Sequence, residues 1–286
     1  MDESLPDREH WLPSPLLRGS LVFHLVAGAA VALSPGLWPL ALGGLVANHL
    51  ILSTVGLVPR GTLLGPNLTR LPAAAGRSVA ITIDDGPDEV VTPRVLEILA
   101  RHGARATFFC VGERVAAHPQ LARAIVRAGH AIENHSQHHY YSFSLLGPRA
   151  MGAEIALAQR QIEATCGVLP RFFRAPAGLR NPFLQPILAQ AGLALASWTR
   201  RGFDTVAGEA ALVERRLLHG LGAGDILLLH DHRAARTPAG VPVILEVLPR
   251  VLDAIAAAGL ATVTLRDALA PSPLSVFAAG SVVASR

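Results

Sequence analysis

From Ser78 onward the chain alternates short apolar runs with longer amphipathic segments, and this alternation constrains the fold more than any other feature. The apolar runs read SVAITID, RATFFCVG, HAIENH, RFFRAP, LALASWT, DILLLHD and LATVTL, and helix-like segments such as TPRVLEILARHG, QLARAIVRAG and AEIALAQRQIEATCG stand among them. Strands that alternate with helices indicate βα units and a mostly parallel sheet. About seven strands predict an α/β fold of the distorted (β/α)7-barrel type.

The amino-terminal region differs from the rest, because it contains no Asp, Glu, Lys or Arg from Leu21 to Leu57. This run is long enough for two membrane spans of about 17 to 20 residues each, with a turn at Ser34–Gly36. A cleaved signal peptide fits poorly, since its apolar core is about 7 to 15 residues long. We therefore predict a hydrophobic helical hairpin over 20–58 that inserts into the cell (inner) membrane. The alternative is a hairpin buried within a soluble protein.

Arginine residues flank the uncharged run on both sides and are absent from the turn between its halves. They are Arg8 and Arg18 before the run, and Arg60, Arg70 and Arg77 after it. The positive-inside rule then places both flanks, and the domain that follows, in the cytoplasm. His24, Asn48 and His49 would be costly in a membrane unless they face the other helix or the interface.

The composition fits one sizeable domain with an accessory segment, since 51% of the 286 residues are hydrophobic and only 16% are charged. We divide the chain into an amino-terminal flank (1–19), the hairpin (20–58), a linker rich in Pro, Gly and Ala (59–77), the α/β domain (78–270) and a carboxy-terminal tail (271–286). No aromatic-interleaved basic patch is present, so nucleic acid is not a predicted partner. No oligomeric state follows from the sequence.

The two cysteines, Cys110 and Cys166, stand far apart in the chain. They match neither a disulfide framework nor a CxxC metal site. We interpret both as small hydrophobic residues of the interior.

Polar, titratable residues end several of the predicted strands, and the carboxyl ends of such strands carry the chemistry in α/β barrels. These residues are Asp84 and Asp85, His135 to His139 in HSQHH, Arg174, Asp204 and His230. An Asp-Asp-Gly-Pro cluster alone is compatible with a solvated turn. Five polar ends on apolar strands are hard to explain by packing, and they indicate an active site.

His135 and His139 stand four residues apart, a spacing that puts both imidazoles on one face of a helical turn and lets them bind one metal ion. His138 would point elsewhere. A carboxylate such as that of Asp85 would complete a set of two histidines and one aspartate with open positions for water and substrate. That arrangement is typical of hydrolytic metal sites.

Four segments together resemble the NodB-type polysaccharide deacetylases, carbohydrate esterase family 4. TIDDGP (Thr82 to Pro87) is similar to the family's TFDDGP signature, with Ile83 in place of Phe. HSQHH is similar to H-[ST]-x-x-H, RAPAG (Arg174 to Gly178) to R-x-P-x-[GY], and LLH (Leu228 to His230) to L-x-H. The order and spacing also agree, over about residues 76 to 268.

The resemblance implies a role for each matching residue. Asp84 would be the general base and His230 the general acid, while Arg174 would orient Asp84 and keep it ionised, since a nearby cation favours the charged carboxylate. Asp85, His135 and His139 would bind a divalent metal ion, with Zn²⁺ expected and Co²⁺, Ni²⁺ or Mn²⁺ as alternatives. The expected substrate-binding residues are Leu228, which would line the pocket for the acyl methyl group, Tyr140, near which a backbone N–H would hold the oxyanion, and Pro176.

One family segment, written W-x-x-D-x-x-D-W, is only partly kept in WTRRGFDT, Trp198 to Thr205. Arg201 replaces the first Asp and Thr205 replaces the final Trp, whereas Asp204 is retained. We therefore expect Asp204 to tune His230. The missing Trp removes a wall on which a sugar could stack, which argues against a long polymeric glycan.

Together these features predict a metal-dependent hydrolase that removes an N-acyl group, expected to be N-acetyl, from a membrane- or lipid-linked amino sugar. The partners are then a glycan or glycolipid substrate and, through 20–58, the membrane. One alternative is the same chemistry on another acyl amide, such as an N-formyl sugar or a cell-wall or exported polysaccharide. Another is a non-catalytic, membrane-anchored sugar-binding protein, although the presence of both Asp84 and His230 favours catalysis.

Overall fold

The structure is a computed structural model, and it describes residues 11–269. The strands are β1 (Ser78–Asp84), β2 (Ala106–Cys110), β3 (Ala131–Asn134), β4 (Phe172–Phe173), β5 (Ala194–Leu195), β6 (Arg200–Arg201), β7 (Ile226–His230) and β8 (Ala261–Thr262). The α-helices are α1 (Pro15–Leu33), α2 (Trp38–Gly56), α3 (Val91–Arg101), α4 (Gly112–Ala117), α5 (Pro119–Arg127), α6 (Pro148–Cys166), α7 (Leu184–Gln190), α8 (Ala210–Leu218), α9 (Val243–Ala257) and α10 (Leu265–Leu269). Short 3-10 helices are η1 (Pro35–Leu37), η2 (Ala73–Ala75), η3 (Phe143–Leu145) and η4 (Pro176–Gly178).

The strands form a sheet in the order β5-β4-β3-β2-β1-β7-β6, with β8 paired to the start of β1. The pairings of β1 with β2, β7 and β8, and of β4 with β3 and β5, are parallel. Seven strands along this path, with helices between them, confirm the distorted (β/α)7 fold predicted from the sequence. The strand that sequence reasoning missed is β6, because its two residues, Arg200 and Arg201, give no apolar signal.

The chain divides into two compact units that interleave in sequence. The first comprises the residues up to Thr69, Val111–Ala116 and Glu133–Ser197, and the second comprises Arg70–Cys110, Ala117–Ile132 and the residues from Trp198 on. In the second unit every residue of β1, β2 and β7 is buried, as expected for parallel strands covered on both faces. Helix α9 packs against α3 and α8 in this unit.

The core of the first unit is formed by α6, α7 and the residues around β4 and β5. Its buried members are Phe143, Met151, Ile155, Phe173, Ala175, Leu184, Leu188, Leu193 and Leu195. Met151 and Ile155 stand four residues apart, so they lie on one face of α6. This cluster fixes α6 beside the loop that follows β3, which matters for the site described below.

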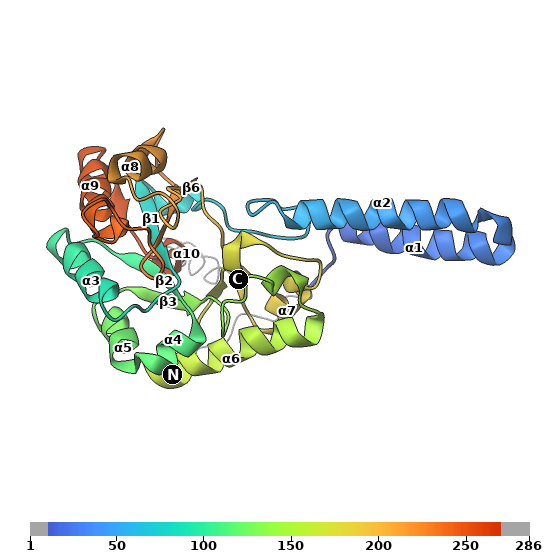
Figure 1. Cartoon of the computed structure of the whole chain (residues 1–286), viewed down its shortest axis with the longest axis horizontal. Helices are drawn as coiled ribbons and strands as arrows, with labels where there is room; N and C mark the ends of the chain where they lie inside the picture. Colours follow the sequence, from blue (N-terminus) through green and yellow to red (C-terminus); the bar gives the residue numbers. More distant parts are fainter. Residues whose placement is uncertain (1–10, 270–286) are drawn as a thin grey trace, which may run out of the picture. The chain divides into compact units, whose positions relative to one another are not determined.

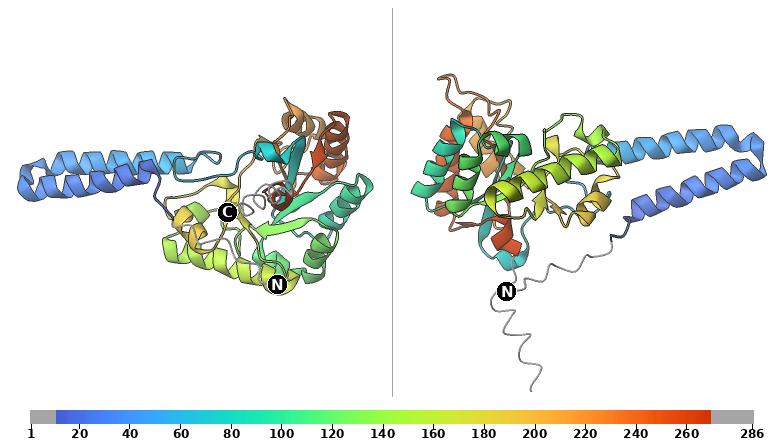
Figure 2. Two further views of the ribbon diagram at one scale, coloured as in Figure 1. Left: turned by 180° about the vertical axis from the view of Figure 1, so that it is seen from behind. Right: turned by 90° about the horizontal axis from the view of Figure 1, so that it is seen from below.

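Helices α1 and α2 lie side by side as a hairpin (Figures 1 and 2). Both are long and apolar enough to cross a membrane, and large side chains such as Leu25 and Leu40 are 65% and 75% exposed. The polar residues lie between the helices: Asn48 Nδ2 donates to Ser20 Oγ at 2.9 Å, and the rings of His24 and His49 are 5.2 Å apart. The polar groups thus face the other helix. From the sequence, this is one of the two positions in which they would not be costly in a membrane.

Residues 57–69, which we call the strap, pack on the rest of the first unit. Leu68 forms a parallel bridge with Ala196, and Leu64 is buried at 1% exposure. At the end of α2, Gly56 O accepts a hydrogen bond from the backbone N–H of Arg180 at 3.2 Å, and the Arg180 side chain donates to Gly61 O. The domain boundaries proposed from composition remain predictions, and the tail at 271–286 lies outside the described residues.

Candidate active site

The adjacent carboxylates of Asp84 and Asp85 stand at the end of β1, and both are buried, at 3% and 6% exposure. Asp85 has a φ of 75°, a conformation that few residues other than glycine adopt. The chain therefore leaves the extended conformation between the two residues. Strain of this kind in a buried, charged residue is a feature of functional sites.

His230 ends β7, the parallel neighbour of β1, and its Cα is in register with that of Asp84. Residues in register on neighbouring parallel strands point to the same face of a sheet, and the strands lie about 4.8 Å apart. The carboxylate of Asp84 and the imidazole of His230 therefore belong to one face at one level. Leu228, two residues earlier on β7, lies on that face as well.

Asp204 holds His230 through two hydrogen bonds. Its Oδ1 lies 2.9 Å from His230 Nδ1, and its Oδ2 accepts from the His230 backbone N–H at 2.7 Å. Burial of the imidazole lowers the pKa of His230, but the charge of Asp204 and this hydrogen bond, with smaller contributions from Asp85 and Asp84, outweigh that and raise the pKa to about 9. The imidazole is thus a protonated acid at neutral pH, with its Nε2 turned away from Asp204.

Two further carboxylates surround this strand end, and sequence reasoning missed both. Asp231 accepts hydrogen bonds from the Thr92 hydroxyl and from the His232 N–H, and its burial raises its pKa to about 7. Asp88 pairs with His232 Nδ1 at 2.9 Å and accepts from Val91 N–H at the start of α3. The available signal was their position, directly after His230 and within the DDGPD segment.

The first of the two histidines after β3 is held by a neutral partner. His135 Nδ1 lies 2.8 Å from the carbonyl oxygen of Arg174, and because a carbonyl can only accept, Nδ1 carries the proton and Nε2 keeps its lone pair. The ring of His139 lies 4.9 Å from that of His135. The loop turns through positive φ angles at Ser136 and His139, 65° and 52°, and not through the helical turn expected from the spacing.

Helix α6 fixes this loop from one side. Glu154 is buried, and its two carboxylate oxygens lie 3.0 Å from the backbone nitrogen of His138 and 2.7 Å from its Nδ1. His138 therefore turns toward α6, as the sequence predicted when it assigned that residue no metal-binding role. Glu154 is a third residue that the sequence did not reveal, because no local pattern links it to a loop 16 positions earlier.

Comparison with known proteins identifies the family. A family model described as polysaccharide deacetylase matches residues 72–196. A chitooligosaccharide deacetylase from Bradyrhizobium sp. (strain ANU 289) is 37% identical over 156 residues, which is 54% of this chain and 71% of that protein. This chain belongs to the polysaccharide deacetylase family.

Two further proteins extend the comparison of the deacetylase with its relatives. A peptidoglycan-N-acetylglucosamine deacetylase from Bacillus cereus (strain ATCC 14579) is 32% identical over 175 residues, or 60% of this chain and 81% of that protein. The crystal structure of a mutant of BA3943, a CE4 family pseudoenzyme of Bacillus anthracis, with restored enzymatic activity, superposes with a TM-score of 0.63 and 25% identity, over 71% of this chain and 70% of that one. The predicted enzyme class, a carbohydrate deacetylase of a metal-dependent family of hydrolases, is confirmed.

The residues of the deacetylase fit a divalent metal ion. Asp85, His135 and His139 each offer one ligand atom, and these atoms lie within 4.8 Å of one another. Two imidazole nitrogens with one carboxylate oxygen suit zinc and its neighbours in the first transition series. The carbonyl of Arg174, by holding Nδ1 of His135, leaves Nε2 available to an ion.

Four other predicted site residues have defined surroundings. Arg174 is 1% exposed, and its guanidinium donates to the carbonyls of Ala196 and Ser197 at 3.2 and 2.8 Å. Pro176 is buried in η4, Leu228 is buried in β7, and Tyr140 is 47% exposed and stacks on His138. Their roles toward Asp84 and the substrate remain predictions.

Proposed function

We propose that this deacetylase hydrolyses the N-acetyl group of an amino sugar with the help of one divalent metal ion, and that the sugar is membrane- or lipid-linked. The observation that carries the chemistry is the register of Asp84 with His230, together with the carboxylate of Asp204 on His230 Nδ1. It supplies a carboxylate base and a protonated imidazole acid on one face of the sheet. Such a pair serves general acid–base catalysis.

Each residue has one task in the proposed reaction. Asp84 accepts the proton of the attacking water, and His230 donates a proton to the departing amine of the sugar. Asp204 keeps His230 protonated, and Arg174 orients Asp84. A bound divalent ion, held by Asp85, His135 and His139, supplies Lewis-acid activation of water and of the acyl carbonyl. The products are a free amino sugar and acetate.

The names of the relatives support a substrate that contains N-acetylglucosamine, since they act on chitooligosaccharide and on peptidoglycan. The hairpin supports a membrane-linked form of such a sugar, because its exposed apolar side chains fit lipid. The flanking arginines favour the cytoplasmic side. A reporter fused at Arg286 tests that side; activity of the reporter only in the extracytoplasmic compartment would invert the topology and favour a cell-wall or exported glycan.

The function is tested by acetate release from a lipid-linked N-acetyl amino sugar and from chitooligosaccharide, with the full chain in detergent. Asp84→Asn should keep the metal and lower the rate at least about a hundredfold, the usual scale for a general base. Asp253→Asn is the matched control, since its side chain is 75% exposed. Equal rates for wild type and Asp84→Asn would exclude the proposed base, and no acetate from either substrate would exclude the reaction.

A further inference from the structure

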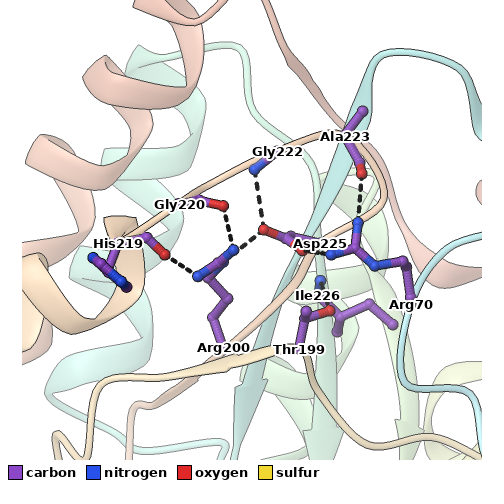
Figure 3. Close-up of polar contacts among 9 residues, drawn as sticks. All are labelled: Arg70, Thr199, Arg200, His219, Gly220, Gly222, Ala223, Asp225 and Ile226. Atoms are coloured by element: carbon purple, nitrogen blue, oxygen red, sulfur yellow. Dashed lines mark hydrogen bonds and ion pairs between the residues drawn. The ribbon is translucent and has the colours of Figure 1, made fainter.

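The two arginines of β6 have different surroundings, and the difference points to a second substrate contact. Figure 3 shows Arg200 turned toward Asp225, which lies directly before β7. Arg200 Nε lies 2.6 Å from Asp225 Oδ2, and Arg70 approaches the other carboxylate oxygen, also at 2.6 Å. Because Asp225 is fully buried, Arg200 has a structural partner for its charge.

Arg201, the next residue, points to the other face of the strand. Its Cα is in register with that of Leu228 on β7, and residues in register share a face. His230 follows Leu228 by two positions, so it lies on that face too. Arg201 therefore projects from the face that carries the proposed general acid.

Aromatic rings hold the Arg201 side chain in place. Its guanidinium carbon lies 5.4 Å from the ring centroid of Trp198 and 4.9 Å from that of Phe203, and the guanidinium of Arg216 lies 5.4 Å from the same Phe203 ring. Stacking fixes the plane of a guanidinium while its N–H groups stay available for hydrogen bonds. Within residues 11–269 the Nε of Arg201 has no hydrogen-bond partner.

The charge at this position lacks a nearby acid to balance it. Asp204, three residues on, is fully buried and bonded to His230, and no carboxylate pairs with Arg201 or Arg216 among the described residues. The family segment has Asp where this chain has Arg201, so the sign of the charge is reversed at a position close to the catalytic acid. A neutral sugar can accept hydrogen bonds from Arg201, but it carries no negative charge to balance that of the guanidinium, whereas a phosphoryl group does.

We propose that Arg201 binds a phosphoryl group carried by the amino-sugar substrate and so selects sugar phosphates over neutral oligosaccharides. A planar guanidinium binds two phosphoryl oxygens at once, which gives both strength and orientation. The inference rests on the proposed deacetylation. The phosphoryl group can belong to a free sugar 1-phosphate or to the phosphate that joins a sugar to a polyprenyl lipid.

Binding is measured first, because it needs no turnover. N-acetylglucosamine 1-phosphate is titrated calorimetrically into the full-length Asp84→Asn protein in detergent, with and without Arg201→Ala. Loss of a charge-assisted hydrogen bond should weaken binding about tenfold to a hundredfold. Arg215→Ala is the matched control, since Arg215 is an exposed residue next to Arg216 on α8. Equal affinities for the Arg201→Ala and Arg215→Ala proteins would overturn the inference.

Turnover then separates the two sources of phosphate. The ratio of kcat/KM for a phosphorylated substrate to that for diacetylchitobiose is measured with the sugar 1-phosphate and with a polyprenyl-phosphate-linked sugar. Arg201→Ala should lower this ratio at least about tenfold for the preferred source, and Arg201→Asp, which restores the family residue, should favour the neutral sugar. An unchanged ratio for both sources would refute the inference even if acetate is released, whereas failure of the proposed deacetylation would show as no acetate from any sugar.

Discussion

One histidine of this deacetylase directly follows β3 and another ends β7, and the two differ in what holds Nδ1. After β3, His135 donates from Nδ1 to a neutral carbonyl, that of Arg174. At the end of β7, His230 pairs through Nδ1 with the carboxylate of Asp204, and its pKa is raised to about 9. The first arrangement offers a lone pair to a metal ion, and the second offers a proton to a leaving group. The partner of one ring nitrogen thus decides the chemistry of the other.

Replacing His135 and replacing His230 should have different effects on bound zinc and on activity. The loss of activity on replacing His135 is the largest effect that we expect. His135→Ala should lose bound zinc and at least about a thousandfold in activity, since a metal ion supplies several kcal/mol to the reaction. His230→Ala should keep the zinc and lose about a hundredfold. Metal analysis of the purified proteins and acetate release measure both. The division of roles between the two histidines would be wrong if the His230→Ala protein also lacks metal, or if the His135→Ala protein retains one zinc ion per chain.

The Asp204→Asn substitution should leave the imidazole of His230 neutral over more of the pH range. Without the carboxylate charge of residue 204, only the smaller contributions of Asp85 and Asp84 oppose the effect of burial, so the pKa of His230 falls. A general acid works when protonated, so the rate should fall as pH rises through the pKa, near pH 9 in the wild type and at a lower pH in the variant. At pH 8 we expect a loss of about tenfold to a hundredfold, and a smaller loss at pH 6. An unshifted alkaline limb in the pH–rate profile would show that Asp204 does not set the protonation of His230.

Glu154→Gln should have the smallest effect and should act on the metal-binding loop. The amide keeps the size of the side chain but loses its charge and one acceptor toward His138, so the loop that carries His135 and His139 is held less firmly. Outer-shell changes of this kind weaken metal affinity about tenfold to a hundredfold, and kcat at saturating zinc should change less than about threefold. Zinc competition with a chelator measures the affinity. Glu163→Gln, exposed on the same helix, is the control, and equal zinc affinities for the two variants would exclude this role for Glu154.

The sequence predicted those parts of the molecule that depend on local patterns. Period and composition located β1, β2, β3 and β7, and the strand ends drew attention to Asp84, Asp85 and His230. The pairings that hold these residues were harder to predict, because they join distant segments: Glu154 acts on a loop 16 positions earlier, and Asp88 meets His232 across 144 positions. Short strands such as β6 carry too few residues for a periodic signal.

The consequence of having Arg201 where the family segment has Asp could not be predicted from the sequence alone. Arg201 departs from a family segment, and such a departure alone does not say where the side chain points. The register of β6 with β7 gives that direction. The proposed phosphoryl contact therefore gives a function to a residue that the motif alone presents as a mismatch.

The strap determines where the hairpin can be cut away from the catalytic part of the chain. Composition suggests a fragment that begins at Ser78, but such a fragment would lack the buried side chain of Leu64, the bridge from Leu68 to Ala196, and the acceptor that Gly61 gives to Arg180. A fragment that begins at Leu57 keeps all three. A fragment for crystallisation that lacks the hairpin but keeps these contacts should therefore start at the end of α2, where Gly56 O also accepts from the Arg180 N–H.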